Sequence, residues 1–142
     1  MSATPVGPFL NSHFRVEIAG MPYIDFTLVI LPEASAEVIE VRNGGDPRNI
    51  LKAPGIIKFS NLILQRGVTE SKDLFAWWTN IANGVSDRRN VSVILLDAHL
   101  KPMKQWIFSK VWPSKYIVSP LIPGNDTVTE TIECVTESFQ LA

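Results

Sequence analysis

The sequence predicts a mostly β domain with one flanking α-helix, arranged as a small β-barrel or as two packed antiparallel sheets. Most apolar segments are short, and they either alternate with polar residues or are apolar throughout, as is typical of strands. One segment has helical spacing instead. The chain has 142 residues, of which 46% are hydrophobic and 19% charged, a composition that suits one folded domain. We expect that domain at residues 9–142, after a flexible N-terminal segment at residues 1–8 that is rich in proline and glycine.

Four strands are predicted in the first half of the chain. Polar and apolar residues alternate strictly in His13–Ile18, so the apolar side chains of this strand share one face. The segment Phe26–Leu31 is apolar on both faces and ends at Pro32, which predicts a strand covered on both sides. The third and fourth strands are Glu37–Arg42 and Lys58–Arg66.

A long loop, Asn43–Gly55, is predicted between the third and fourth strands. It holds three glycines and two prolines. Hairpin turns usually have two to five residues, and loops longer than about 12 residues are usually functional or disordered. The Gly44-Gly45 pair lacks the strand-turn-helix context of a phosphate-binding loop, so we interpret it as turn geometry. The loop is therefore a candidate for contact with another molecule.

The one predicted helix lies between Thr69 and Gly84. Thr69 is a suitable N-cap, and Gly84 can adopt the left-handed conformation that ends a helix. An apolar stripe with helical spacing runs along it, so the helix is expected to pack on a sheet. The stripe consists of Leu74, Trp77, Trp78 and Ile81. We interpret the two tryptophans as core residues rather than a base-stacking or carbohydrate-binding surface, although Trp78 can also lie at the rim of an interface.

The second half of the chain predicts a β-hairpin and a final strand. Val91–Leu96 and Met103–Lys110 form the hairpin, with a turn at Asp97–His99. A proline-rich connection is expected at Trp112–Gly124. The final strand is Thr127–Glu137, in which one face carries Thr127, Thr129 and Thr131.

No cofactor, metal or catalytic residue is expected. His13 and His99 are the only histidines and Cys134 is the only cysteine, too few for a zinc cluster or a disulfide. Cys134 fits a buried, inert thiol in an amphipathic strand. No nucleotide-binding or hydrolase motif is present. The net charge of -1 removes the bulk electrostatic argument for a nucleic-acid-binding or anionic-membrane-binding protein.

Paired carboxylates do not predict a glycosidase. Glu37 and Glu40 are three residues apart in a strand, as are Glu130 and Glu133, so each pair divides between opposite faces.

The sequence also predicts a protein made in the cytoplasm without a direct membrane anchor. The first eight residues lack the basic and apolar regions of a secretory signal. The longest apolar segments, Phe26–Leu31 and Val91–Leu96, fall far short of the roughly 20 residues that span a bilayer.

An ordered set of short motifs extends over almost the whole chain, from Phe9 to Leu141. The motifs are Glu37–Pro47, Ala53–Gly55, Leu64–Gly67, Trp77-Trp78, Arg88–Asn90, Leu95–Asp97, Trp106, Trp112-Pro113 and Lys115. In this order they resemble the inner tube proteins of contractile phage tails, R-type bacteriocins and extracellular contractile injection systems. The type VI secretion tube protein is a structural cousin of that family.

The resemblance implies a non-enzymatic structural subunit that forms hexameric rings, which stack into a hollow tube inside a contractile sheath. Its partners would be further copies of itself, the sheath protein, and baseplate and tube-terminating proteins. DNA or a protein effector is a possible lumen cargo. The subunit would be assembled in the bacterial cytoplasm and become part of a virion or of a released or anchored phage tail-like particle.

Three sets of residues are the candidate contacts implied by this resemblance. The loop that would reach the neighbouring subunit or ring contains Asn43, Gly44, Gly45, Asp46, Pro47, Arg48, Asn49, Lys52 and Pro54. The outward surface of the 69–83 helix, with Lys72 and Asn80, would meet the sheath. Thr127, Thr129 and Thr131 would line the lumen.

Three alternatives stay open at this point. The chain could be a tube initiator or baseplate adaptor ring, which would form single rings without elongating. It could be a small β-barrel that carries an effector through such a tube. A hydrolase with unrecognised carboxylates is the third alternative.

Overall fold

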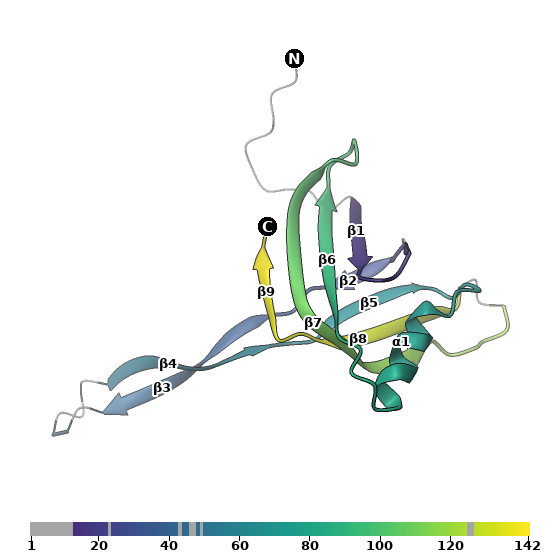
Figure 1. Cartoon of the computed structure of the whole chain (residues 1–142). Helices are drawn as coiled ribbons and strands as arrows, with labels where there is room; N and C mark the ends of the chain where they lie inside the picture. The colour runs from purple at the N-terminus through teal and green to yellow at the C-terminus, as the bar shows by residue number, and fades with distance from the viewer. Residues whose placement is uncertain (1–12, 23, 43, 46–47, 49, 125–126) are drawn as a thin grey trace, which may run out of the picture.

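The computed structural model of the chain describes residues 13–22, 24–42, 44–45, 48, 50–124 and 127–142 (Figure 1). These residues form nine strands and one helix, which confirms the prediction of a mostly β fold with one flanking helix. The strands are β1 (His13–Ile18), β2 (Leu28–Ile30), β3 (Ala34–Arg42), β4 (Ile50–Phe59), β5 (Leu62–Gly67), β6 (Arg89–Leu96), β7 (Pro102–Val118), β8 (Thr129–Val135) and β9 (Ser138–Leu141). The helix is α1 (Asp73–Ala82).

Seven strands form one antiparallel sheet. Six of them follow the order β1-β6-β7-β8-β5-β2, and the seventh, β9, pairs with β7. Strand β7 has 17 residues and takes part in both parts of this sheet. Its first half pairs with β6 and β9, and its second half pairs with β8. The change between the two halves coincides with Lys110, which has a positive φ of 53°. As a result the sheet divides into two parts that cross steeply (Figure 1).

The hydrophobic core lies between the two parts of the sheet. Strands β5 and β8 contribute directly opposed pairs to it, Leu62 with Cys134 and Leu64 with Ile132, and all four side chains are buried. Burying a leucine or isoleucine side chain stabilises a fold by about 1.5–3 kcal/mol. The other buried members of the core cluster are Val16, Ile18, Ile24, Phe26, Leu74, Trp77, Val91, Val93, Phe108 and Val111.

Helix α1 covers the part of the sheet that contains the second half of β7, and it packs there through its predicted apolar stripe (Figure 1). Leu74 and Trp77 are buried, and Trp78 and Ile81 are half-buried. The helix begins later than predicted, because Thr69 does not cap it: the Thr69 hydroxyl accepts a hydrogen bond from the backbone N–H of Ser71, at 3.2 Å. The predicted stop is confirmed, since Gly84 has a left-handed φ of 81°.

The predicted limits of four strands are wrong. The Phe26–Leu31 segment forms only the short strand β2, which is covered on one face: Val29 packs against the core, whereas Leu28 and Ile30 are exposed on the other face. The proline-rich connection begins later, because β7 continues through Pro113 by means of a register shift before Lys115. The predicted final strand Thr127–Glu137 corresponds to β8 alone, and β9 follows it as a separate strand. The predicted fourth strand Lys58–Arg66 is divided between the end of β4 and β5.

The described residues include no helix that is long and apolar enough to cross a membrane.

Candidate assembly surfaces

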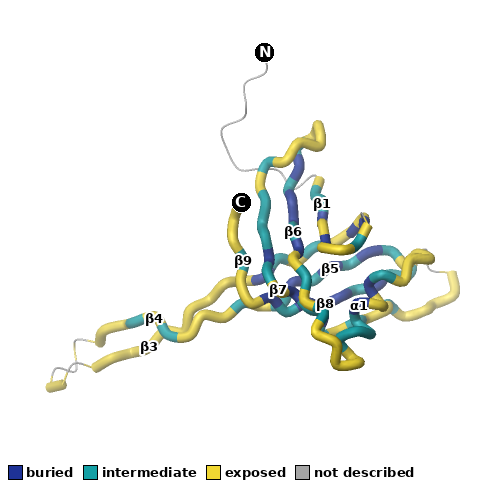
Figure 2. Tube along the Cα trace, in the orientation of Figure 1, coloured by how far each residue is buried: buried dark blue, intermediate teal, exposed yellow. Residues whose placement is uncertain are grey.

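Strands β3 and β4 form a long hairpin that projects from the rest of the molecule (Figure 1). This hairpin arm is a separate two-stranded sheet, and among the described residues it pairs with no strand of the larger sheet. Nearly its whole length is exposed (Figure 2), including large apolar side chains that are 42% to 64% exposed. These are Val38, Ile39, Val41, Ile50, Leu51, Ile56 and Ile57. Because an isolated hairpin is marginally stable and exposed apolar patches mark interaction sites, the hairpin arm is the leading candidate surface.

A β-bulge divides the hairpin arm about half-way along its length. Ala36 pairs with Ile57, but Val38 pairs with Pro54, so β4 has one residue more than β3 between these pairs. Gly55 lies in this bulge directly against Ile39: a Cβ atom on Gly55 would come within 2.9 Å of Ile39 Cδ1. A side chain at this position would require the Ile39 side chain and the Glu37 carbonyl to shift, which favours glycine here.

The base of the hairpin arm is attached to the C-terminal strand. Phe59, the last residue of β4, packs edge-on against Phe139 of β9, with ring centroids 5.2 Å apart. Phe139 in turn packs against Phe108 of the core, at 5.5 Å. The Ser60 N–H donates to the Glu33 carbonyl, and the Glu33 N–H donates to the Ser60 hydroxyl, at 3.0 and 2.7 Å. These contacts fix the direction in which the arm leaves the body.

The structure corrects the predicted loop Asn43–Gly55. Residues 50–55 belong to β4, so Lys52 and Pro54 are strand residues that lie opposite Glu40 and Val38. Gly44, Gly45 and Arg48 lie in the turn at the tip, where Gly45 has a φ of 96°. Asn43, Asp46, Pro47 and Asn49 lie outside the described residues. Proline and glycine usually interrupt strands, which is why the sequence predicts a loop here; in the structure Pro54 pairs with Val38, and the bulge accommodates Gly55 beside it.

The threonines predicted to line a lumen lie on the side of β8 opposite the core. Glu130, Ile132 and Cys134 are buried, so alternation places Thr129 and Thr131 on the other face, where both are half-buried. Thr127 is exposed just before the strand.

Some neighbouring side chains on this outer face are also polar. The Gln65 side chain donates to the Thr129 hydroxyl at 3.0 Å, and Lys115 Nζ lies 3.8 Å from a carboxylate oxygen of Glu133. Exposed apolar side chains lie among them: Ile117 is directly opposite Thr131, and Leu28 is directly opposite Gln65. The outer face is therefore a mixture of polar and apolar side chains.

The two helix residues predicted to meet a sheath have different environments. Lys72 is exposed at the N-terminus of α1. Asn80 is half-buried, and its side-chain amide donates to Asp87 Oδ2 at 2.9 Å. Asp87 also accepts hydrogen bonds from Arg89, which hold the pKa of its carboxyl below the usual value. Asn80 thus helps to secure the segment between α1 and β6.

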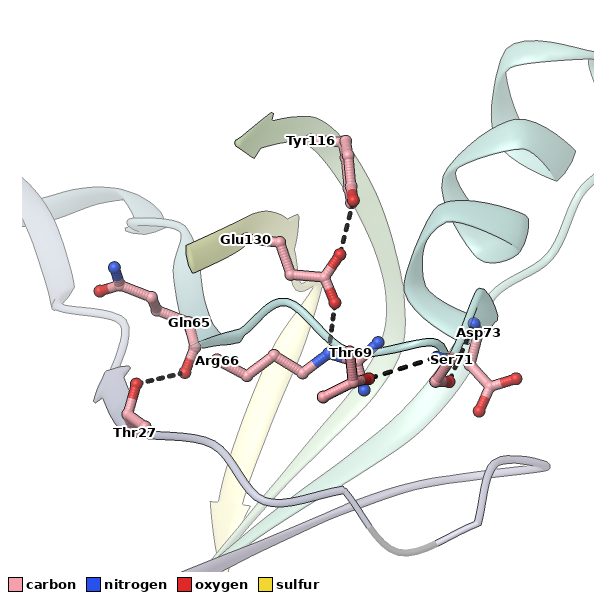
Figure 3. Close-up of polar contacts among 8 residues, drawn as sticks. All are labelled: Thr27, Gln65, Arg66, Thr69, Ser71, Asp73, Tyr116 and Glu130. Atoms are coloured by element: carbon pink, nitrogen blue, oxygen red, sulfur yellow. Dashed lines mark hydrogen bonds and ion pairs between the residues drawn. The ribbon is translucent and has the colours of Figure 1, made fainter. Parts of the chain in front are cut away.

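A buried ion pair lies beneath the segment that leads into α1 (Figure 3). Arg66 of β5 and Glu130 of β8 are directly opposed, and both side chains are 5% exposed. Arg66 Nε donates to Glu130 Oε1, and the Tyr116 hydroxyl donates to Glu130 Oε2 at 2.5 Å. Burial and this hydrogen bond raise the pKa of Tyr116 to about 12. The cluster joins three strands, β5, β8 and β7.

This buried cluster was missed in the sequence, although a signal for it was present. Arg66 shares a strand face with Leu62 and Leu64, and Glu130 shares one with Ile132. A charge of each sign on the apolar faces of two strands indicates a buried pair.

The chemistry of these surfaces is that of packing and hydrogen bonding. Cys134 is buried, and its burial raises the pKa of the thiol, which suits an inert side chain. Among the described residues, no group of three or more His, Cys, Asp or Glu side chains could hold a metal ion.

Residues 10–140 match the family of the T4-like virus tail tube protein gp19. The chain belongs to this family. The match includes nearly the whole of this tail tube chain, in agreement with the family resemblance of its ordered motifs. No curated protein sequence gives a significant match.

Several solved structures have the same fold as this tail tube chain. One is a chain in the baseplate of the anti-feeding prophage (AFP), with a TM-score of 0.84 and 21% identity, covering 96% of this chain and 97% of that one. Another is a chain in the extended sheath-tube complex of the extracellular contractile injection system PVC, with a TM-score of 0.82 and 21% identity, covering 95% and 91%. Hcp1 from Flavobacterium johnsoniae aligns with a TM-score of 0.58 and 18% identity, covering 91% and 94%.

Proposed function

We propose that this tail tube protein is a structural subunit whose copies form hexameric rings, and that the rings stack into the hollow inner tube of a contractile tail or injection system. The observation that carries the proposal is the hairpin arm, whose apolar side chains find no cover within the described chain. Surfaces of this kind belong to permanent interfaces, which resemble a hydrophobic core divided between two molecules.

The position of the hairpin arm favours association between copies. The arm leaves one end of the molecule, while the segment 119–124 and the start of α1 lie at the opposite end (Figure 1). That opposite end also exposes apolar side chains, among them Val118, Leu121 and Ile122. Contacts between two different surfaces of the same chain are heterologous, and they generate closed rings or open filaments according to the rotation between copies.

Unpaired strand edges support a continuous wall between neighbouring copies. Within the described residues β2 pairs only with β5, and β9 pairs only with β7, so each has an edge without a partner strand. Pairing such edges across subunits would satisfy their backbone groups and close a large barrel.

The outer face with Thr129 and Thr131 is proposed to face the lumen, with Thr127 at its margin. Its threonines and its Lys115–Glu133 pair suit contact with water or cargo, and DNA and protein effectors are both candidate cargoes. The exposed surface around Lys72 of α1, with Asn80 in a supporting role, is proposed to meet the sheath. The other partners would be baseplate and tube-terminating proteins, within a particle that is assembled in the cytoplasm.

A shortened hairpin arm tests the main proposal. Residues 37–56 are removed, and Ala36 is joined to Ile57 through an Asn-Gly turn, which preserves their pairing at the base. The wild-type chain should form annuli and rods in negative-stain micrographs. The shortened chain should keep its circular dichroism and core melting transition but remain monomeric. Rods formed by the shortened chain, or a wild type that stays monomeric at all concentrations and with its natural partners, would overturn the proposal.

An initiator or adaptor ring is the second candidate function, because a similar structure is a chain within a baseplate. The same micrographs separate the two functions: an initiator forms single rings that do not lengthen as the concentration rises, whereas a tube subunit forms rods.

A further inference from the structure

The apolar surface of the hairpin arm changes sides half-way along its length. In the outer half, Val41 lies opposite Leu51 and Ile39 lies opposite Ala53, and these four residues form one face. We call them the distal patch. The reverse face of the outer half carries charges, with Glu40 opposite Lys52 and Arg42 opposite Ile50.

In the inner half of the hairpin arm the arrangement is inverted. Ala36 lies opposite Ile57 and Val38 lies opposite Pro54, and these residues share the face that carries Glu40 and Lys52 further out. We call these four residues the proximal patch. The face that continues the distal patch inward becomes polar beyond the bulge, with Ser35 opposite Lys58. In the bulge itself Glu37 lies opposite Gly55 and the exposed Ile56.

The distal and proximal patches therefore face different directions. They adjoin on β3, where Val38 is followed directly by Ile39, and consecutive strand residues project to opposite faces. The twist of a two-stranded ribbon over so short a distance does not bring the patches to one side. One flat partner surface can cover one of them but not both.

We infer that the hairpin arm is held between two other copies of this chain, one covering the distal patch and the other covering the proximal patch from the opposite side. This inference rests on the proposed function. Copies are the fitting occupants because neither patch carries a charge, as expected of a permanent homomeric interface. An arm held between two copies joins three chains, so it can connect a neighbour in one ring to a subunit of the next.

Two matched pairs of substitutions test each patch separately. Leu51→Glu places a carboxylate in the distal patch, and Ile50→Glu places the same group on the reverse face, opposite Arg42. Ile57→Glu places a carboxylate in the proximal patch, and Ser35→Glu places one on the polar face, opposite Lys58. All four positions are exposed in the single chain, so each variant should fold as the wild type does by circular dichroism and thermal melting.

The readout is the assembled fraction in sedimentation velocity and in micrographs. Leu51→Glu and Ile57→Glu should each reduce it about tenfold or more, because each buries an unpaired charge in an interface. Ile50→Glu and Ser35→Glu should assemble as the wild type does. Normal assembly of Ile57→Glu or Leu51→Glu would overturn the inference while leaving the proposed function intact. A wild type that does not assemble would instead remove the proposed function.

Cross-linking shows whether two different surfaces cover the hairpin arm. A benzophenone amino acid at position 51 or at position 57 is activated in rods made from mixed isotopically light and heavy chains. We expect cross-links between different copies from both positions, with different target peptides. Cross-links within a single chain from position 57, or the same target peptide from both positions, would contradict the inference.

Discussion

Phe59 and Phe139 pack edge-on at the base of the hairpin arm, with an interplanar angle of 69°. They are far apart in the sequence, and they connect the last residue of β4 to the C-terminal strand β9. Phe139 also contacts Phe108 of the core, so the direction of the arm depends on the packing of the C-terminal strand.

We predict that Phe139→Ala loosens the direction of the hairpin arm without unfolding the body. The substitution should cost about 2 kcal/mol of stability, less than a fully buried phenylalanine would, because Phe139 is half-buried. Spin labels on Lys52→Cys and Lys101→Cys report the angle of the arm, since the native Cys134 is buried. The distance distribution should broaden in Phe139→Ala and stay narrow in Phe139→Leu. An unchanged distribution in Phe139→Ala would assign the direction to the Glu33–Ser60 contacts instead.

Gly55→Ala should destabilise the hairpin arm selectively, because the added methyl group would meet the Ile39 side chain and the Glu37 carbonyl oxygen. Hydrogen exchange of the arm amides should accelerate, while exchange in β5 and β8 stays unchanged. Gly67→Ala is the matched control, since a Cβ there meets nothing within 4 Å. Equal exchange rates in both variants would show that the bulge tolerates a side chain.

The buried pair of Arg66 and Glu130 predicts non-additive losses of stability. Arg66→Met or Glu130→Gln alone should cost about 3–5 kcal/mol, because each leaves an uncompensated or poorly paired group in the interior. The double variant should cost clearly less than the sum of the two single losses. Urea unfolding monitored by tryptophan fluorescence measures all four proteins. Additive losses would mean that the pair does not interact strongly in the folded state.

Asp87 predicts a loss of stability in acid. Its pKa is lowered in the folded chain, mainly by the hydrogen bond from Arg89, so its contribution is complete above the unfolded pKa near 3.8 and is lost as the pH falls through the folded value. The difference in unfolding free energy between the wild type and Asp87→Asn should therefore be constant near neutral pH and shrink below about pH 4. A difference that is independent of pH would show that only the neutral hydrogen bonds matter.

The proposed lumen face predicts a size-dependent reactivity in assembled tubes. Thr131→Cys should react with a small maleimide and resist a maleimide carrying a large polymer, which enters only at tube ends. Lys72→Cys, on the proposed outer surface, should react with both reagents when no sheath is present. Equal reaction of the two cysteines with the large reagent would place Thr131 outside the lumen.

The sequence predicted the elements that depend on local patterning. The helix stripe of Leu74 and Trp77, the left-handed Gly84 and the hairpin of β6 and β7 all follow from periodicity and turn chemistry. It failed where tertiary context decides. Pro54 and Pro113 lie within strands because bulges and register shifts accommodate them, and single-sequence rules assign such prolines to loops.

The candidate surfaces were predicted only in part. The tip of the hairpin arm lies within the predicted contact loop, but the amphipathic character of its two halves depends on the register of β3 against β4, which the sequence did not reveal. To predict the buried pair of Arg66 and Glu130, one would have to know that β5 and β8 are neighbours in the sheet.

The exposed apolar hairpin arm also bears on how free subunits can be stored. Under the proposed assembly, a newly made copy keeps these apolar side chains in water until a neighbour covers them, so free copies at high concentration are prone to aggregate. The time that a copy stays free would depend on how quickly growing tubes take it up. Synthesis of the subunit would then have to keep pace with tube nucleation.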